Sequence, residues 1–267
     1  MIASTLHAHR ALLLAGMLAA ASTGAEASVS FVATGPNTYS GGHTLAAQAI
    51  FDLSGSVLSI TLKNISTDTL DRPSDVLMGL FFDLAPPYTL SSPTATRSAG
   101  SSYVNLATPS SSTNLGGEWA YRYSATGLSG STVTAKYGVS GSGLGGTFGA
   151  GDRICSACPE LSSGGGSAPD GLDYGIVSNS YVANTGSGVT SSVELVRNSI
   201  SFMFNVAGGS ILNLGAVISN VSFQYGTALD EPRLAGVNIS EPTSAALLAL
   251  GGLLSCRKRR SMAKSAA

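Results

Sequence analysis

The amino-acid sequence predicts an all-β protein built as a single β-sandwich, of jelly-roll or immunoglobulin-like type. Short apolar runs alternate with polar residues, and Gly, Ser, Asn and Pro separate these runs. No long helical periodicity occurs between residues 28 and 239. Only 11% of the 267 residues are charged while 43% are hydrophobic, which predicts a packed core under a nearly neutral surface rather than a disordered chain.

Charge is distributed unevenly along the chain. The whole sequence has a net charge of −1, yet residues 28–242 contain 8 Lys and Arg against 14 Asp and Glu, a net charge of −6. The positive charge is concentrated at the two ends. A surface that binds nucleic acid needs a basic stripe that displaces counterions from phosphates, so the acidic body argues against a nucleic-acid partner.

Residues 1–27 have the pattern of a secretory signal peptide, which we expect to form an N-terminal signal helix. Arg10 precedes the apolar run Ala11–Ala21, and small residues lead to the cleavage pattern Ala25-Glu26-Ala27. The run is shorter than the roughly 20 residues that span a bilayer. We therefore expect the Sec translocon and signal peptidase to process this end, with Ser28 as the first mature residue. An N-terminal helix buried in the fold is the alternative.

Residues 28–239 supply the strands of the predicted sandwich. The clearest pair is Leu45–Leu53 and Val57–Lys63, joined by a Ser-Gly-Ser turn and apolar at every second position of the second run. Val76–Leu84 is almost continuously apolar, which predicts a central strand. The other strands expected are Val29–Ala33, Glu118–Tyr123, Thr132–Val139, Val189–Val196, Ile200–Val206 and Val217–Tyr225.

Two Gly-rich stretches, Gly141–Gly151 and Ser162–Gly171, predict long loops. A boundary between two sub-domains near residue 160 is an alternative to one sandwich. We expect one domain over residues 28–239, because neither half has a complete run of strands of its own.

Cys155 and Cys158 form a C-x-x-C pair. Such a pair indicates a redox site beside a βαβ unit, or half of a zinc site when a second pair is present, and neither context occurs here. In an exported protein we expect a disulfide that pins the tip of the Gly-rich loop, with two free thiols as the alternative.

Candidate catalytic residues are few. His43 is the only histidine after residue 27, and it follows two glycines near no recognisable nucleophile motif, which predicts a surface histidine on a loop. A glycosidase needs two carboxyls across a groove lined with aromatic residues. Glu118-Trp119, with Tyr121 and Tyr123, could imitate that pattern, but no second carboxylate can be paired with Glu118 and the tryptophan is expected in the core.

A metal site is not indicated either. Zinc sites use several His and Cys ligands, which the body lacks. Asp152, Asp170 and Asp173 lie in Gly-rich loops and could offer oxygens to Ca²⁺, but their spacing does not match an EF-hand loop. We therefore expect no catalytic site, no metal and no cofactor.

The tail after residue 239 divides into three parts. Ser240-Glu241-Pro242 is a polar break, residues 243–256 are uncharged and mostly apolar, and Arg257, Lys258, Arg259 and Arg260 form a basic stop. A helix of 14 residues reaches about 21 Å, short of a hydrocarbon core of roughly 30 Å. The segment therefore predicts a transient transmembrane-like signal with its basic end in the cytoplasm. The alternatives are an amphipathic helix packed on the body and a lasting anchor that is never cut.

This tail resembles the PEP-CTERM sorting signal of bacterial proteins that are processed by exosortase. In that family the break is usually Pro-Glu-Pro, and here Ser240 stands in place of the first Pro. The resemblance implies that residues 240–260 are the sorting signal, with Glu241 and Pro242 as recognition residues for a membrane protease, and that residues 261–267 are a cytoplasmic end. Four body segments are similar to those of some exosortase-dependent surface proteins: Leu45–Ser66, Phe148–Arg153, Asp170–Gly175 and Ser199–Gly226.

The resemblance implies export to the cell surface or exopolysaccharide matrix of a Gram-negative-type bacterium. Together with a surface rich in Ser, Thr, Asn and Gly, it predicts a non-catalytic structural or adhesive protein associated with exopolysaccharide. The alternative from a different class is a secreted carbohydrate-binding module or glycosidase, which requires exposed aromatic residues along a groove.

Overall fold

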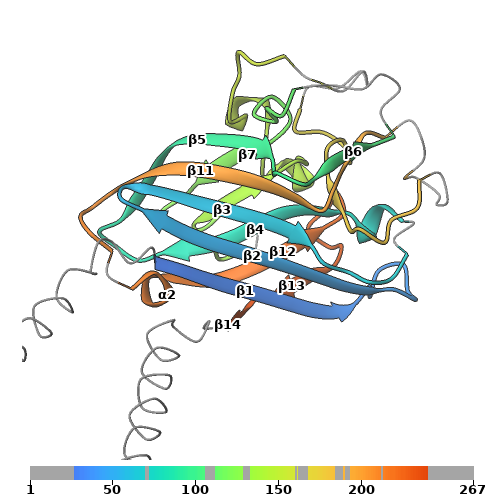
Figure 1. Cartoon of the computed structure of the whole chain (residues 1–267), viewed down its shortest axis with the longest axis horizontal. Coiled ribbons are helices and arrows are strands. Elements are labelled where there is room, and N and C mark those ends of the chain that lie inside the picture. Colours follow the sequence, from blue (N-terminus) through green and yellow to red (C-terminus); the bar gives the residue numbers. More distant parts are fainter. Residues whose placement is uncertain are drawn as a thin grey trace, which may run out of the picture.

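Strands with alternating apolar residues form two β-sheets that pack face to face as a sandwich (Figure 1). The structure is a computed structural model that describes residues 27–69, 72–105, 112–128, 133–159, 161, 168–183, 189, 193–211 and 213–239. The predicted all-β sandwich is confirmed at this level. The helices expected in the leader and in the tail lie outside the described residues. Within the described ranges, no helix combines the length and the apolar character needed to cross a membrane.

Sheet A contains six antiparallel strands among the described residues. In spatial order they are β14 (Val237–Ile239), β1 (Ala27–Pro36), β2 (Thr44–Ser54), β3 (Val57–Asn64), β11 (Ser199–Ala207) and β5 (Thr89–Arg97).

Sheet B contains eight strands in the same part of the chain, and it forks at β4. Its main path is β13 (Arg233–Ala235), β12 (Ile218–Tyr225), β4 (Leu77–Leu84), β9 (Ile176–Val177), β10 (Leu195–Arg197) and β6 (Ser102–Val104). The branch is β8 (Tyr137–Ser140), which pairs with β4, and β7 (Ala120–Tyr123), which pairs with β8. Short helical turns are η1 (Pro73–Asp75), η2 (Leu144–Gly146), η3 (Ala150–Asp152) and α2 (Leu214–Val217).

The predicted hairpin of β2 and β3 is confirmed. Burial alternates strictly along both strands, and Leu53 pairs with Leu58 next to the turn. Strand β11 then joins the other edge of β3, with Phe202 opposite Ile60. Both sheets therefore combine strands from either side of residue 160.

Aromatic side chains join the two sheets across the core. Phe51 of sheet A lies edge-on to Phe31 at 5.7 Å and to Phe82 of sheet B at 5.4 Å between ring centroids. The rings of Trp119 and Phe202 of β11 lie 5.2 Å apart between centroids and are tilted by 60° to each other. Such pairs stabilise a core beyond the apolar area that they bury.

Strand β4 is buried on both faces, as expected for a central strand. Leu80 and Phe82 belong to the core between the sheets, while Phe81 packs outward against Phe148. The Gly-rich stretch Gly141–Gly151, expected as a long loop, contains the short turn η2 and the start of η3, and it covers this outer face. A side chain at Gly138 would meet Leu128 and Phe81 at 2.7 and 2.8 Å, so the cover needs glycine there.

Two expected strands are much shorter in the structure. Among residues 133–139, the described part of Thr132–Val139, only β8 is a strand, because the backbone at residues 135 and 136 bonds to the loop of residues 124–128 and to the side chain of Asp83. Among the described residues of Val189–Val196, which are 189 and 193–196, only Leu195 and Val196 belong to a strand, β10.

Strand β5 was not expected at all. Its sequence, rich in Ser and Thr with Pro93 in the middle, resembles a loop. Proline is tolerated there because β5 is the edge of sheet A, and a bulge in its pairing with β11 falls beside Ser92, whose φ is 51°.

Replacing Phe51 by alanine tests the aromatic contact between the sheets. We expect Phe51→Ala to lower the free energy of unfolding by about 3–5 kcal/mol, because the cavity lies between both sheets. Met203→Ala is the control, since Met203 is 47% exposed on the outer face of sheet A and should change stability by no more than about 0.5 kcal/mol. Denaturant unfolding measures both, and equal losses would contradict this account of the core.

Candidate functional site

The two ends of the described body lie on neighbouring strands. Ala27 and Ser28, on either side of the expected leader cleavage, open β1, and Ile239 ends β14 directly before the expected sorting signal. Ser30 pairs with Ile239 in an antiparallel register, so both ends leave sheet A at the same end (Figure 1). Ala25 and the sorting residues Ser240 to Arg260 lie outside the described residues.

Glu118 and Trp119 do not line a groove. Trp119 is fully buried, as expected, and its Nε1 donates a hydrogen bond to the carbonyl oxygen of Tyr174 at 3.2 Å. Glu118 is 1% exposed, and its carboxylate accepts a bond from the backbone N–H of Leu161. Tyr121 packs in the core against Phe204. Of the four aromatic or acidic residues in this candidate set, Tyr123 alone is exposed.

Three carboxylates act on Asp173, which the sequence did not predict. Burial, and next the negative charges of Glu194, Asp170 and Glu118, raise the pKa of Asp173 to about 6. Glu118 therefore has acidic neighbours that come from residues more than 50 positions away, a distance over which sequence spacing gives no signal.

The calcium ligands considered from the sequence do not come together as a set. Asp152 is separate from the cluster around Asp173, and its Oδ2 accepts the backbone N–H of Gly149 at 2.9 Å. In the part of the chain that the structure describes, no three His, Cys, Asp or Glu side chains are placed to hold a metal ion.

His43 is not a simple surface histidine, which corrects the sequence expectation. Its side chain is 22% exposed, and Nδ1 lies 2.8 Å from Oδ2 of Asp75, a fully buried residue. The other oxygen of Asp75 accepts a bond from Nδ2 of Asn37 at 2.7 Å, and the backbone N–H of Arg72 also donates to this carboxylate. The turn before β2 and the turn η1 are thus held together by one buried carboxylate.

A serine stands next to this pair without forming the geometry of a nucleophile. Ser74 is buried, and its hydroxyl lies 2.6 Å from the hydroxyl of Ser40 and accepts a bond from Asn37 at 2.9 Å. A catalytic serine must instead be open to substrate and bonded to the histidine. The arrangement fits a polar network that fixes two turns.

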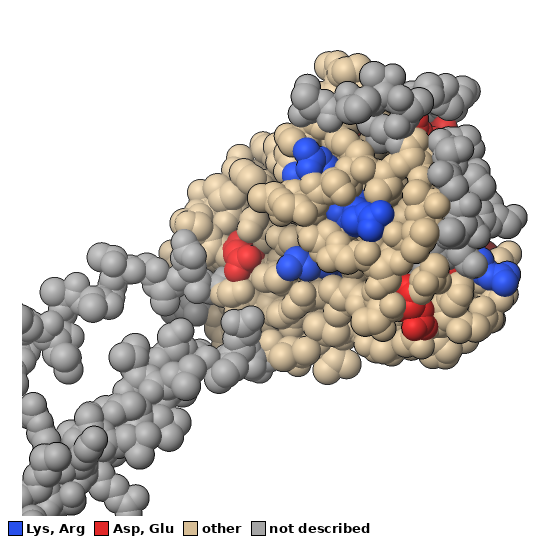
Figure 2. Space-filling model, turned by 45° about the vertical axis from the view of Figure 1, so that its right-hand side comes forward, with Lys and Arg blue, Asp and Glu red and all other residues tan. Residues whose placement is uncertain are grey.

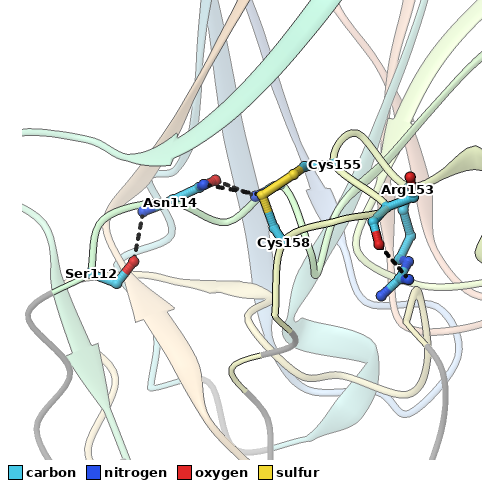
Figure 3. The surroundings of a disulfide bond; sticks show 7 residues. Ser112, Asn114, Arg153, Cys155 and Cys158 are labelled. Atoms are coloured by element: carbon cyan, nitrogen blue, oxygen red, sulfur yellow. Dashed lines mark hydrogen bonds between the residues drawn. A yellow bond between two sulfur atoms is a disulfide. The ribbon is translucent and has the colours of Figure 1, made fainter.

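The structure contains the expected disulfide between Cys155 and Cys158 (Figure 3). Nδ2 of Asn114 lies 3.4 Å from Sγ of Cys158, and the backbone N–H of Cys155 donates to the carbonyl oxygen of Gly116 at 2.7 Å. A side chain at Gly117 would lie 2.6 Å from the carbonyl oxygen of Pro159. The disulfide turn therefore packs directly on the backbone that leads to Glu118 and Trp119.

One pocket, of about 330 Å³, opens on the outer face of sheet B. It lies between strands β12 and β13 and the segment of residues 133–135. Its lining is mostly polar, and includes Thr134, Asn220, Ser222 and Arg233. No sequence motif points to these residues, because they come from three separate segments of the chain.

The surface carries isolated charges on a largely uncharged background, and Figure 2 shows this for one face. The comparisons with protein-family models, with curated proteins and with solved structures found no match.

Removing the buried carboxylate tests the network around His43. We expect Asp75→Ala to lower the free energy of unfolding by about 3 kcal/mol, because Asn37, His43 and the Arg72 backbone lose a charged acceptor. Asp52→Ala, on the outer face of sheet A, is the matched control and should cost no more than about 0.5 kcal/mol. Denaturant unfolding measures both variants, and equal losses of unfolding free energy would contradict this account of the network.

The cluster around Asp173 predicts a dependence of stability on pH. A carboxyl whose pKa rises from 3.8 to about 6 on folding favours the folded state only while it is protonated, so this contribution is complete below pH 3.8 and is lost as the pH rises through 6. Asp173→Asn should therefore match the native chain near pH 4 and exceed its stability at pH 7, by about 1 kcal/mol after allowing for solvent screening.

Thermal unfolding between pH 4 and pH 8 measures this difference. Asp52→Asn removes one carboxylate far from the cluster and is the control. If Asp173→Asn raised the stability by the same amount at every pH in this range, the acidic neighbours would not act on Asp173.

Proposed function

We propose that this chain is an exported, non-catalytic protein of the bacterial cell surface or extracellular matrix, delivered by exosortase-type processing of its tail. The observation that carries the proposal is the order of three parts in the tail. Glu241-Pro242 comes first, an apolar run too short for a stable span follows, and the basic stop Arg257–Arg260 ends the signal. The last strand among the described residues, β14, ends at Ile239, directly before this signal.

The pairing of β1 with β14 supports the proposal that proteases cut the chain at both ends. Because Ser30 lies opposite Ile239, the leader and the tail would leave the body side by side and reach one membrane without crossing the domain. Signal peptidase and an exosortase-type protease would then act at the same end of the sandwich. The opposite end would face away from the membrane.

The surface supports a role in a hydrated matrix. Only 11% of the residues of the whole chain are charged, and hydroxyl and amide side chains are abundant, so the surface can hydrogen-bond to polysaccharide without strong charge attraction. The jelly-roll or immunoglobulin-like assignment of the sandwich belongs to the same proposal. It is supported by the mostly antiparallel pairing of the strands, in which only β9 and β10 are parallel among the described residues, and by the crossing of the chain between the two sheets.

The surroundings of the candidate catalytic residues favour a non-catalytic role. Glu118 is buried, and its carboxylate accepts a hydrogen bond from the backbone of Leu161. His43 is bonded to the carboxylate of Asp75, which also fixes two turns. A carbohydrate-binding module stays the second candidate, because the pocket beside Arg233 offers polar groups to a ligand.

Mass mapping of the exported protein tests the sorting proposal. The full chain is expressed in a host that carries an exosortase and in the same host without it. We expect the N-terminus to be Ser28 in both strains and the residues after the sorting break to be lost only where exosortase is present. Leader removal is thus an internal control for export.

A matched pair of variants sharpens the result. Glu241→Ala with Pro242→Ala should leave the tail intact in the exosortase strain, whereas Asp52→Ala, which removes a carboxylate from the body, should leave processing unchanged. The sorting proposal fails if the C-terminal masses are the same in both strains.

A further inference from the structure

We propose that the pocket beside Asn220 and Arg233 binds an acidic sugar residue, with the guanidinium of Arg233 pairing with the carboxylate of a uronic acid. The pocket is formed by Asn220 and Ser222 of β12, Arg233 and Ala235 of β13, and the segment of residues 133–135. These elements lie on the outer face of sheet B, where Gln224 pairs with Arg233 and Ser222 pairs with Ala235.

Arg233 is a cation to which the described residues supply no counter-charge. Among the described residues, its Nη1 is buried without a hydrogen-bond partner, and no carboxylate forms an ion pair with it. Burial lowers the pKa of its guanidinium, so the charge is kept partly away from water at a cost in free energy. An anion in the pocket would offset that cost, and the planar fork of arginine matches a carboxylate.

The polar wall of the pocket is held in place before any ligand arrives. Nδ2 of Asn220 donates to Oδ2 of Asp83 and to Oγ1 of Thr134, each at 3.2 Å. Asn220 has a φ of 51° and lies at a bulge between Ser219 and Ser222 in the pairing of β12 with β4. Bulges often redirect a side chain at a functional site, and this one turns an amide toward the pocket.

The acidic group nearest this wall does not oppose an anion directly. Asp83 is not part of the lining, and its two oxygens accept bonds from the backbone N–H of Lys136, at 2.7 Å, and from Asn220. Both oxygens of Asp83 are therefore engaged by hydrogen bonds, and Asp83 lies outside the lining to which Asn220 and Arg233 belong.

Size and lining together define the class of ligand. A volume of about 330 Å³ is at the low end for small-molecule sites and suits one sugar unit of a chain. Hydroxyl and amide groups from Thr134, Ser222 and Asn220 suit a hydroxylated ring, and Arg233 adds the requirement for a negative charge. The inference that this sugar belongs to an acidic exopolysaccharide rests on the proposed function. The inference that the pocket binds an acidic sugar does not.

Calorimetric titration of the exported protein, purified from its producing cells, tests the site. The ligands are a galacturonate trisaccharide, the neutral galactose trisaccharide of the same linkage, and inorganic sulfate. We expect the acidic trisaccharide to bind at least about tenfold more tightly than either of the others, because it alone supplies both a carboxylate and sugar hydroxyls. Equal binding of the neutral trisaccharide, or of sulfate, would overturn the proposal.

Variants separate the charge from the shape of the pocket. Arg233→Gln should weaken binding of the acidic trisaccharide about tenfold or more and leave the neutral one unchanged, while Lys63→Gln, which removes a cation from the opposite sheet, should have no effect. Ala235→Leu fills the pocket from an exposed position with the arginine intact, and it should also abolish binding. Full binding by both pocket variants would refute the site.

This titration is independent of the sorting test. It uses the purified protein whatever its C-terminus, and a failure to bind would leave the mass mapping of the tail unaffected. Conversely, an uncut tail would not change the expected preference for the acidic trisaccharide.

Discussion

The burial of strand β4 on both faces is the constraint on which the rest of the structure depends. One face packs on sheet A through Phe82, and the other would expose Met78 and Phe81 unless the chain covered it. Two long connections between strands provide this cover, one before and one after residue 160. A sheet with two buried faces demands such a layer, because its apolar outer face would otherwise meet water.

The covering layer brings charged groups into places where water is scarce. Glu118 is buried beneath it and Asp173 is partly buried in it. A buried charge is tolerated when other groups bond to it, as the backbone of residue 161 does for Glu118 and as Asn37 and His43 do for Asp75. Arg233 is different, since the described residues give it no such partner.

The sequence predicted the strands whose pattern is local. Alternation in β2, β3 and β11, and the continuous apolar run of β4, follow directly from burial on one or both faces. It could not predict β5, because an edge strand accepts Pro93 and serines that elsewhere indicate a loop. The neighbours of Asp173 and the lining of the Arg233 pocket were also missed, since both sets form only when distant segments fold together.

The last two strands connect the pocket to the end of the body. Strand β13 carries Arg233 on sheet B, and after the single residue Gly236 the chain enters β14 on sheet A. A side chain at Gly236 would lie 3.1 Å from Val221, so the crossing is close to β12 and its direction is narrowly fixed. Strand β14 itself is exposed and pairs only with β1 among the described strands. The Arg233 pocket and Ile239, the last described residue, are therefore joined by one short segment of chain that packs against β12.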